Sequence, residues 1–237
     1  GILILILSLS TTIVRAAALL QSRRPSEPGK VDGALVLADH RPLPQMSVLI
    51  PLYDEPEMIS RLLDGLSDVD YPLPLLDIKI LLEEGDQATI EAVMSADLPP
   101  HVTMMVLPDG FPRTKPRALN IALDFCSGDI IGVLDAEDRP DPGQFREVAE
   151  YLRGAATDIG CVQCQLAFFF APEYWITRCF QIEYSIWFDV LLRGWQNLGL
   201  PIPLGGTSVY FRRRALQDLG GWDAHNVTED ADLGMRL

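Results

Sequence analysis

Apolar and polar residues form two kinds of segment from residue 46 onward. Four short apolar runs, each typical of a buried strand, cover residues 47–53, 78–82, 102–106 and 129–134. Between them, apolar residues recur at helical spacing over residues 58–66, 87–96 and 117–126. Buried strands that alternate with amphipathic helices are typical of a mostly parallel sheet with helices on both faces. We therefore predict an α/β fold for residues 46–237.

Acidic residues follow three of these four strands. The three groups are Tyr53-Asp54-Glu55, Glu83-Glu84-Gly85-Asp86 and Asp135-Ala136-Glu137-Asp138. Because ligands of such folds bind beyond the carboxyl ends of the strands, we expect the three groups to converge on one edge of the sheet. Carboxylates gathered there repel one another unless a cation or a proton relieves the charge. The glycine-rich signatures of dinucleotide sites and P-loops do not occur, so both of those sites are disfavoured.

The first twenty residues contain a single charge, Arg15. That length is close to the requirement for crossing a bilayer, and we predict a transmembrane helix over residues 1–20. A buried amphipathic helix or a signal-peptide core are the alternatives, the latter disfavoured because the basic residues follow the apolar run. Arg23 and Arg24 then indicate an inner or plasma membrane protein whose catalytic part is cytoplasmic. Residues 21–45, rich in Pro and Gly, are a predicted linker, and the first residue, Gly1, suggests a truncated chain.

The net charge of −14 is unevenly distributed. Residues 1–41 carry five basic and three acidic side chains, or +2, and the remainder therefore carries −16. Such an acidic surface argues against a nucleic-acid partner. The four cysteines form no disulfide framework, and Cys161 and Cys164 have no second pair nearby to complete a zinc site. We interpret all four as core residues.

Six ordered motifs carry a family resemblance: VLIPLYDEPE (48–57), LLEEGD (81–86), PRTKPRALN (112–120), GVLDAEDRPDP (132–142), PLGGTSVYFRR (203–213) and GGWDAHNVTEDADLGMRL (220–237). In these motifs the chain resembles the inverting family-2 glycosyltransferases of the cellulose synthase superfamily. The resemblance covers residue 46 to the last residue and implies a GT-A fold with a nucleotide-sugar site. The Q-x-x-R-W motif of polymerising relatives is absent from the chain, which we expect to be truncated at its C-terminus too.

The resemblance also implies donor-binding residues. Pro51, Tyr53 and Glu55 would border the nucleotide base and ribose. Glu83 and Glu84 stand where the family usually has an Asp pair, a departure because Glu is longer by one methylene. Lys115 and Asn120 would lie beside the donor, where an ammonium group suits a diphosphate.

Asp135-Ala136-Glu137 stands in the place of the family's D-x-D metal motif. Two carboxylates one residue apart after a strand can hold one Mg²⁺ or Mn²⁺ that bridges the diphosphate. Asp135 is the principal predicted ligand, and either Glu137 or Asp138 completes the site.

Asp230, in Thr228-Glu229-Asp230, is the predicted general base that removes a proton from the acceptor hydroxyl. Glu229, the residue before it, is a predicted substrate-binding residue that would also support Asp230 as a base. The same residues also suit a helix start, with Thr228 as the cap and Leu233 and Leu237 on the buried side.

Two further features each allow two interpretations. Gly206 and Thr207 would border the acceptor sugar or form a tight turn with no ligand. Trp222 would stack on a sugar or belong to the core. The aromatic segment 173–198 is a predicted helix with core packing and some membrane contact.

The resulting expectation is a membrane-anchored, inverting, metal-dependent hexosyltransferase. It would use a nucleotide-diphosphate sugar, with UDP the expected nucleotide, and a saccharide or lipid-linked acceptor in exopolysaccharide or cell-envelope glycan synthesis. The alternatives are a non-catalytic nucleotide-sugar-binding module and a sugar nucleotidyltransferase. The second alternative would usually have a glycine-rich basic loop after its first strand, and Pro51-Leu52-Tyr53-Asp54 is unlike one.

Overall fold

The computed structural model describes residues 2–23, 42–167 and 174–237. These residues belong to two compact units. Gly1–Pro28 and Cys164–Pro203 form the helical unit, and Gly29–Gln163 and Leu204–Leu237 form the α/β unit. Most of the predicted linker, residues 21–45, lies outside the described residues, and the predicted extent of one catalytic domain over 46–237 stays a prediction.

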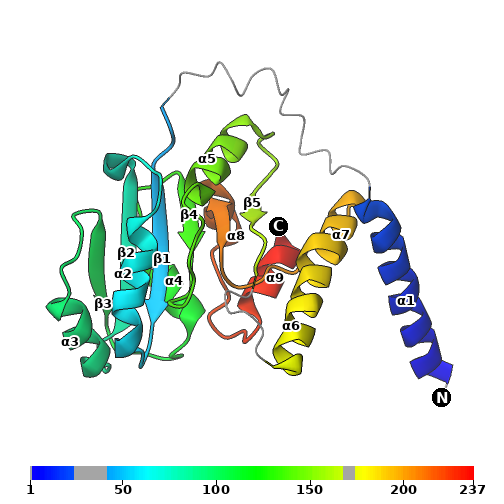
Figure 1. The fold of residues 1–237 in the computed structure, drawn as a ribbon, viewed down its shortest axis with the longest axis horizontal. Coiled ribbons are helices and arrows are strands. Elements are labelled where there is room, and N and C mark those ends of the chain that lie inside the picture. Colours follow the sequence, from blue (N-terminus) through cyan, green and yellow to red (C-terminus); the bar gives the residue numbers. More distant parts are fainter. Residues whose placement is uncertain (1, 24–41, 168–173) are drawn as a thin grey trace. The chain divides into compact units, whose positions relative to one another are not determined.

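The α/β unit is built on a six-stranded sheet (Figure 1). Its strands lie in the order β3-β2-β1-β4-β6-β5. Their bounds are Met46–Leu52 (β1), Leu76–Glu83 (β2), Val102–Leu107 (β3), Ile130–Val133 (β4), Cys161–Gln163 (β5) and Val209–Arg212 (β6).

Strand direction decides which residues meet at the edge of the sheet. Strands β1 to β4 are mutually parallel, whereas β6 is antiparallel to both β4 and β5. The pairing of Val133 with Val209 brings the residues just before β6 next to those just after β4. Likewise, Gln163, the last residue of β5, pairs with Val209 and lies at the same edge.

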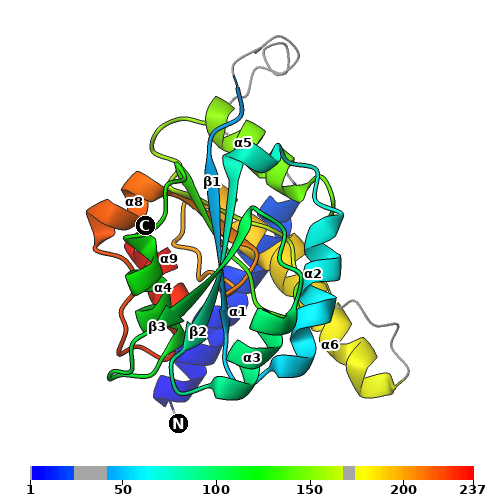
Figure 2. The same cartoon turned by 90° about the vertical axis from the view of Figure 1, so that its left-hand side faces the viewer.

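Helices cover both faces of this sheet, as the alternation of the sequence predicts (Figure 2). On one side lie α2 (Ile59–Ser67), α3 (Gln87–Ser95) and α5 (Gln144–Gly154). On the other side lie α4 (Lys115–Leu123), α8 (Arg213–Leu219) and α9 (Glu229–Arg236). Short 3₁₀ turns at Pro56–Met58 and Leu73–Leu75 precede α2 and β2. The first strands and helices thus match the predicted elements within a few residues, whereas α5, β5 and α8 lie outside every predicted element.

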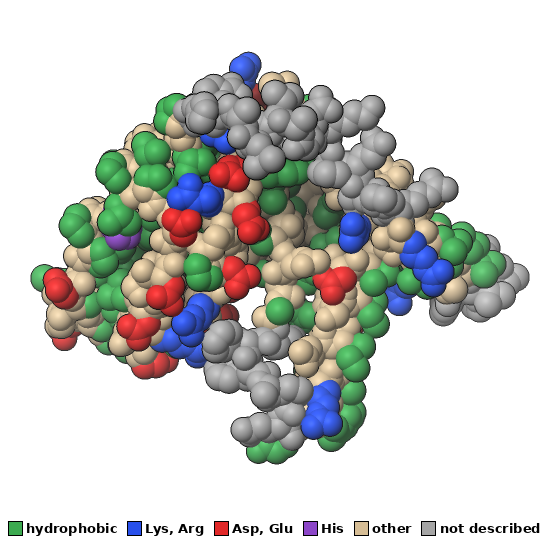
Figure 3. All heavy atoms as spheres, turned by 45° about the horizontal axis from the view of Figure 1, so that its top comes forward, with side chains coloured by type: hydrophobic (Ala, Val, Ile, Leu, Met, Phe, Trp, Pro, Cys, Tyr) green, Lys and Arg blue, Asp and Glu red, His purple; other side chains and the backbone are tan. Residues whose placement is uncertain are grey.

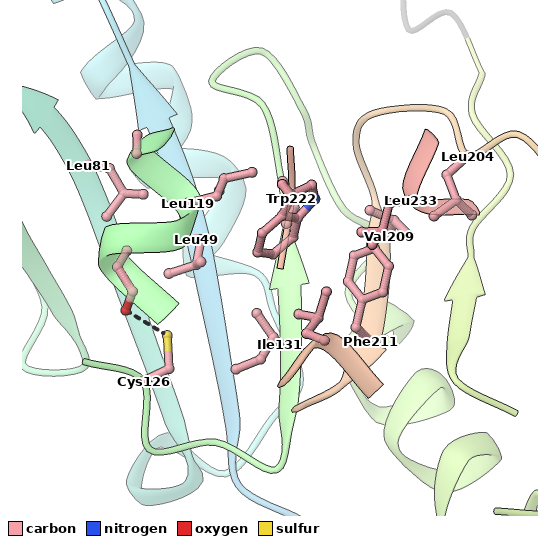
Figure 4. Close-up of a cluster of buried hydrophobic side chains, with 14 of the residues drawn as sticks. Leu49, Leu81, Leu119, Cys126, Ile131, Leu204, Val209, Phe211, Trp222 and Leu233 are labelled. Atoms are coloured by element: carbon pink, nitrogen blue, oxygen red, sulfur yellow. Dashed lines mark hydrogen bonds between the residues drawn. The ribbon is translucent and has the colours of Figure 1, made fainter. Parts of the chain in front are cut away.

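The core on the α4 side joins the sheet to the two C-terminal helices (Figure 4). Leu49 and Leu119 are completely buried there, and Phe211 meets Trp222 edge to face with ring centroids 5.7 Å apart. Trp222 is only 3% exposed, so it is a core residue and the sugar-stacking interpretation of this residue is wrong. Leu233 is fully buried, but Leu237 is 46% exposed, which corrects half of the predicted apolar stripe on α9.

The helical unit contains α1 (Ile2–Ser22) and a second helical stretch. That stretch is formed by α6 (Trp175–Ser185), a π-helix (Ile186–Leu192) and α7 (Arg193–Asn197). A Cβ at Gly194 would lie 2.6 Å from the Ala18 Cα atom, so glycine allows α7 to touch α1. Asn197 also donates to the Gln21 carbonyl at 3.0 Å.

The structure does not support the predicted transmembrane helix over residues 1–20. Within the part of the chain that it describes, no helix combines the length and the apolar composition needed to cross a membrane.

Two further predictions need correction. Among the cysteines only Cys126 is buried in the described structure, and Cys179 on α6 is exposed, so Cys179 is not a core residue. The aromatic helix is less buried than predicted, because Trp175 is 75% exposed and Phe180 is 50% exposed.

Close packing of Gly128 against the start of β1 provides a stability test. A Cβ at this position would lie 2.8 Å from both the Met46 carbonyl carbon and the Ile130 oxygen, and would also meet the Ser47 nitrogen. Backbone atoms cannot rotate away, so we expect Gly128→Ala to lower the free energy of unfolding by about 2 kcal/mol or more. Urea denaturation measures the change. Gly85→Ala, with no neighbouring atom within 4 Å of the added Cβ, is the matched control and should shift stability by less than about 0.5 kcal/mol.

Candidate active site

A cavity of about 450 Å³ opens at the carboxyl ends of the parallel strands. Its lining comes from the ends of β1, β2, β3 and β4 and the start of α4: Pro51, Leu52, Tyr53, Glu55, Leu81, Glu83, Leu107, Arg113, Thr114, Lys115, Ala118, Asp135, Ala136 and Glu137. Each of the three predicted acidic groups contributes at least one side chain to it. The predicted convergence at one edge of the sheet is confirmed.

The acids in this cavity are close enough to affect one another. Partial burial raises the pKa of Glu55 above its usual value, and the charges of Glu137, Glu57 and Asp135 raise it further. On the face of the molecule shown in Figure 3, acidic side chains lie interspersed with Lys and Arg. The cavity therefore differs from the general surface because several carboxylates share one concave space.

Asp138 belongs to the acidic turn but is engaged inside it. Its Oδ2 accepts from the Asp135 backbone N–H at 3.1 Å and from the Thr207 hydroxyl. The same Asp135 N–H is 2.9 Å from the Thr207 Oγ1. Burial raises the pKa of Asp138 despite the hydrogen bond from Thr207. Because Asp135 and Glu137 line the cavity whereas Asp138 is bonded to Thr207, the geometry favours Glu137 over Asp138 as the partner of Asp135.

Lys115 links the acidic turn to the loop before β6. Its ammonium group lies 2.5 Å from Asp135 Oδ1 and donates to the Gly206 carbonyl at 2.7 Å. Pro116 at the second position of α4 has no N–H to satisfy, which suits a helix start, and the helix presents Lys115 from its first turn. Gly206 has a φ of +83°, a conformation that favours glycine and aims its carbonyl at Lys115.

Asp230 lies on the other side of Gly206. A Cβ added to Gly206 would be 3.1 Å from Asp230 Oδ2, so the absence of a side chain there leaves room for the carboxylate. Asp230 is 8% exposed, and its Oδ1 is buried with no hydrogen-bond partner among the described residues. Burial raises its pKa to about 6, the Lys115 charge opposes that rise, and the neighbouring Glu229 adds to it. Thr228 is the N-cap residue of α9, but its hydroxyl donates to Asn226 Oδ1 instead of capping the helix.

A partly buried ion pair lies at the end of β2, where Glu83 lines the cavity. Arg117 Nη1 lies 3.4 Å from both carboxylate oxygens of Glu83, and its Nη2 donates to the Pro108 carbonyl at 2.6 Å. Glu84 instead accepts from the Asp109 backbone N–H at 3.3 Å and does not line the cavity. Arg117 was not predicted as a site residue, although it lies within the PRTKPRALN motif two residues after Lys115.

Asn120 occupies a different place from the one expected. Its side-chain amide donates to the Trp222 carbonyl at 2.7 Å and accepts from the Trp222 N–H at 2.9 Å. These bonds join α4 to the segment before α9. Asn120 is absent from the residues lining the cavity, so its substrate role stays a prediction.

Gln163 is the second residue that sequence reasoning missed. Its Nε2 donates to the Thr207 carbonyl at 2.9 Å, and its Oε1 accepts from the Gly205 N–H at 2.8 Å. One side chain thus holds both sides of the loop whose Gly206 and Thr207 contact Lys115 and the acidic turn. Its place as a polar residue at the carboxyl end of a strand could have revealed Gln163. Strand β5, however, has only three residues, all partly buried, and its sequence does not predict a strand.

The donor set is compatible with a divalent cation. Among the described residues no group of three or more His, Cys, Asp or Glu side chains is close enough to hold a metal ion. Mg²⁺ and related ions, however, are commonly held by one or two carboxylates together with substrate phosphates. Asp135 and Glu137, both facing the cavity, fit that second arrangement.

The comparisons with known proteins agree with this geometry. The sequence model of the family described as "Glycosyltransferase like family 2" matches residues 44–237. The fold is GT-A-like, with a mostly parallel six-stranded sheet. The chain belongs to glycosyltransferase family 2, as the motif resemblance indicates.

Two curated relatives are similar to the chain. A probable glycosyltransferase, YdaM, from Bacillus subtilis is 29% identical over 82% of the chain and 47% of its own length. A beta-monoglucosyldiacylglycerol synthase from Trichormus variabilis is 28% identical over 82% of the chain and 41% of its own. The chain thus spans less than half the length of these curated relatives.

The mannosyltransferase PcManGT from Pyrobaculum calidifontis, solved with GDP-Man and Mn²⁺, has a similar fold. The TM-score is 0.62 at 22% identity over 94% of this chain and 60% of that chain.

We expect Gln163→Leu to weaken the site more than the fold. The loop at 205–208 loses the bonds that hold it, so glycosyl transfer should fall about tenfold or more and the Mn²⁺ concentration for half-maximal activity should rise, by analogy with residues that orient metal ligands. The free energy of unfolding should change by only about 1 kcal/mol. Initial rates against donor and Mn²⁺, with chemical denaturation alongside, separate the two effects.

Gln144→Leu is the matched control for this variant. Gln144 donates to the Tyr210 hydroxyl at 2.8 Å, so its loss removes one hydrogen bond without touching the loop. An equal fall in activity for both variants would contradict a positioning role for Gln163.

Proposed function

We propose that this protein is an inverting, metal-dependent glycosyltransferase that uses a nucleotide-diphosphate sugar, with UDP as the expected nucleotide. The observation that carries the proposal is a chain of contacts. Lys115 bonds to both Asp135 and Gly206, and Gly206 lies against Asp230. In this chain of contacts, an ammonium group and an acidic turn face the cavity, and a buried carboxylate of raised pKa lies directly behind them. This arrangement suits binding of a diphosphate next to a general base.

The donor would occupy the 450 Å³ cavity. Tyr53 and Pro51 would provide an apolar wall for the base and ribose, and the Glu83 carboxylate would offer an acceptor to the edge of the base. Lys115 provides a point charge for the diphosphate. The GDP-Man bound by PcManGT and the UDP preference of the motif resemblance differ in nucleotide, so the donor assay below includes both.

Asp135 and Glu137 would hold Mg²⁺ or Mn²⁺. When bound, such a cation offsets the charge that develops on the leaving diphosphate. Asp138 and Thr207 would hold the backbone of the turn at Asp135 through their hydrogen bonds. Lys115 keeps the Asp135 carboxylate compensated before donor binding, since the two lie 2.5 Å apart.

Asp230 would take the proton of the acceptor hydroxyl as that oxygen attacks the anomeric carbon. A carboxylate on the side opposite the leaving group gives inversion in a single displacement. Its raised pKa makes it a stronger base than an exposed Asp. Its Oδ1, which has no hydrogen-bond partner among the described residues, would accept a hydrogen bond from the hydroxyl of the acceptor.

The wider setting also belongs to the proposal. A saccharide or lipid-linked acceptor, a role in exopolysaccharide or cell-envelope glycans, membrane attachment and a cytoplasmic site are supported by the sequence pattern and the family resemblance. The beta-monoglucosyldiacylglycerol synthase relative adds support for a lipid-linked acceptor through its name alone.

Asp230→Asn tests the assignment of the base. In the full-length protein we expect transfer to fall by about 10³-fold or more, since a proton acceptor is lost and the amide retains the shape. Binding of the donor nucleotide by calorimetry should change less than about threefold, because Asp230 lies behind the diphosphate site.

Nucleotide release is measured from UDP- and GDP-sugars with and without Mn²⁺. Unchanged turnover in Asp230→Asn would refute the base, and tight donor binding without release from any donor would favour a non-catalytic binding module.

The pKa of Asp230 predicts an acidic limit to activity. Below pH 6 its carboxylate is protonated and no longer accepts a proton, so kcat/KM should fall about tenfold per pH unit below a pKa near 6. Glu229→Gln removes a charge that raises this pKa, so the limb should move to lower pH. A pH profile of the two proteins checks both statements, and an unchanged limb in Glu229→Gln would contradict the assignment to Asp230.

A further inference from the structure

The side chains of Phe111 and His225 are exposed on loops of the α/β unit and do not belong to its core. Phe111 is 89% exposed, and its ring centroid lies 6.4 Å from that of His225 at an interplanar angle of 53°. Val227, two residues further on, is 93% exposed. These apolar side chains are thus open to contact with a bound molecule.

The rings belong to the two loops that lead directly into the proposed active site. Phe111 precedes Lys115 by four residues, and His225 precedes Asp230 by five. The Thr114 hydroxyl donates to the Ala224 carbonyl at 2.9 Å, which ties one loop to the other. This bond fixes the positions of Phe111 and His225 relative to Lys115 and Asp230.

A second cavity of about 820 Å³ lies along the first of these loops, lined by residues 109–114. It shares Arg113 and Thr114 with the 450 Å³ donor cavity. The two spaces thus share part of their lining, and a molecule lying beside Phe111 would extend toward the donor site.

The surroundings of the rings are polar. Arg113 forms two hydrogen bonds of 2.9 Å with Asp109, and Asp223 accepts from the His225 backbone N–H. A lipid chain would require a broad apolar surface, whereas a pyranose offers a flat C–H face to an aromatic ring and hydroxyls to charged groups around it. Phe111, His225 and the Asp109–Arg113 pair match the second kind of ligand.

We propose that Phe111 and His225 form a binding subsite for the acceptor saccharide, with Phe111 stacking on a sugar ring beyond the one that is glycosylated. The subsite rests on the proposed glycosyltransferase function and deepens it, because it makes the acceptor a saccharide of more than one ring.

Saturation-transfer NMR on the full-length protein tests the subsite directly. The probes are glucose, cellobiose and mannobiose, each with UDP and Mn²⁺ present. We expect a disaccharide signal in the unaltered protein and a weakening of its binding by about fivefold to tenfold in Phe111→Ser, the range for loss of one aromatic contact. His225→Ala should weaken binding in the same direction. Nucleotide binding should stay within about twofold in both variants.

Phe125→Ser is the matched control, since Phe125 is also an exposed phenylalanine, at 63%, but is not part of either cavity. Equal saccharide binding in Phe111→Ser and the unaltered protein overturns the subsite. So does a loss of binding in Phe111→Ser to vesicles containing diacylglycerol with the disaccharide signal unchanged, which would indicate a lipid acceptor. Failure of UDP and GDP to bind the unaltered protein would instead refute the proposed function.

Discussion

Repulsion among carboxylates at one edge of the sheet is the constraint on which the rest of the site depends. Glu55, Asp135 and Glu137 share a cavity, and the charges of Glu137 and Asp135 raise the pKa of Glu55. Lys115 forms an ion pair with Asp135, and Arg117 forms one with Glu83. The same compensated but still negative space is suited to a divalent cation and a diphosphate, because those two ligands bring both signs of charge with them.

The antiparallel strand β6 makes this edge usable for chemistry. Because β6 runs opposite to β4, the residues before it arrive beside the acidic turn after β4. Thr207 can then bond within the turn, Gly206 can face Lys115 and Asp230, and Gln163 can hold the loop from β5. A wholly parallel sheet would place a helix connection at that point instead of a short loop. The proposed base and the acidic turn after β4 are therefore brought together by one reversal of strand direction.

The sequence predicted the repeating part of the fold well and the irregular part poorly. Runs such as 47–53 and 78–82 are apolar throughout, so burial on both faces was visible in them. Strand β5 has three partly buried residues and carries no such signal, and for that reason Gln163 was missed. Trp222 shows the opposite limit, since stacking on a sugar and packing on Phe211 require the same flat apolar ring. The exposed rings of α6 were likewise predicted to be mostly buried.

The sequence by itself determined the α/β class, the acidic edge and the family, because periodicity and short motifs are local properties. Only the tertiary structure decided that Asp138 bonds inside its turn, that Asn120 bonds to Trp222, and that Asp230 is buried behind Gly206. Each of these depends on hydrogen bonds and burial between residues far apart in the chain. Thr207 follows Asp138 by 69 positions, and Trp222 follows Asn120 by 102. No local pattern carries that information.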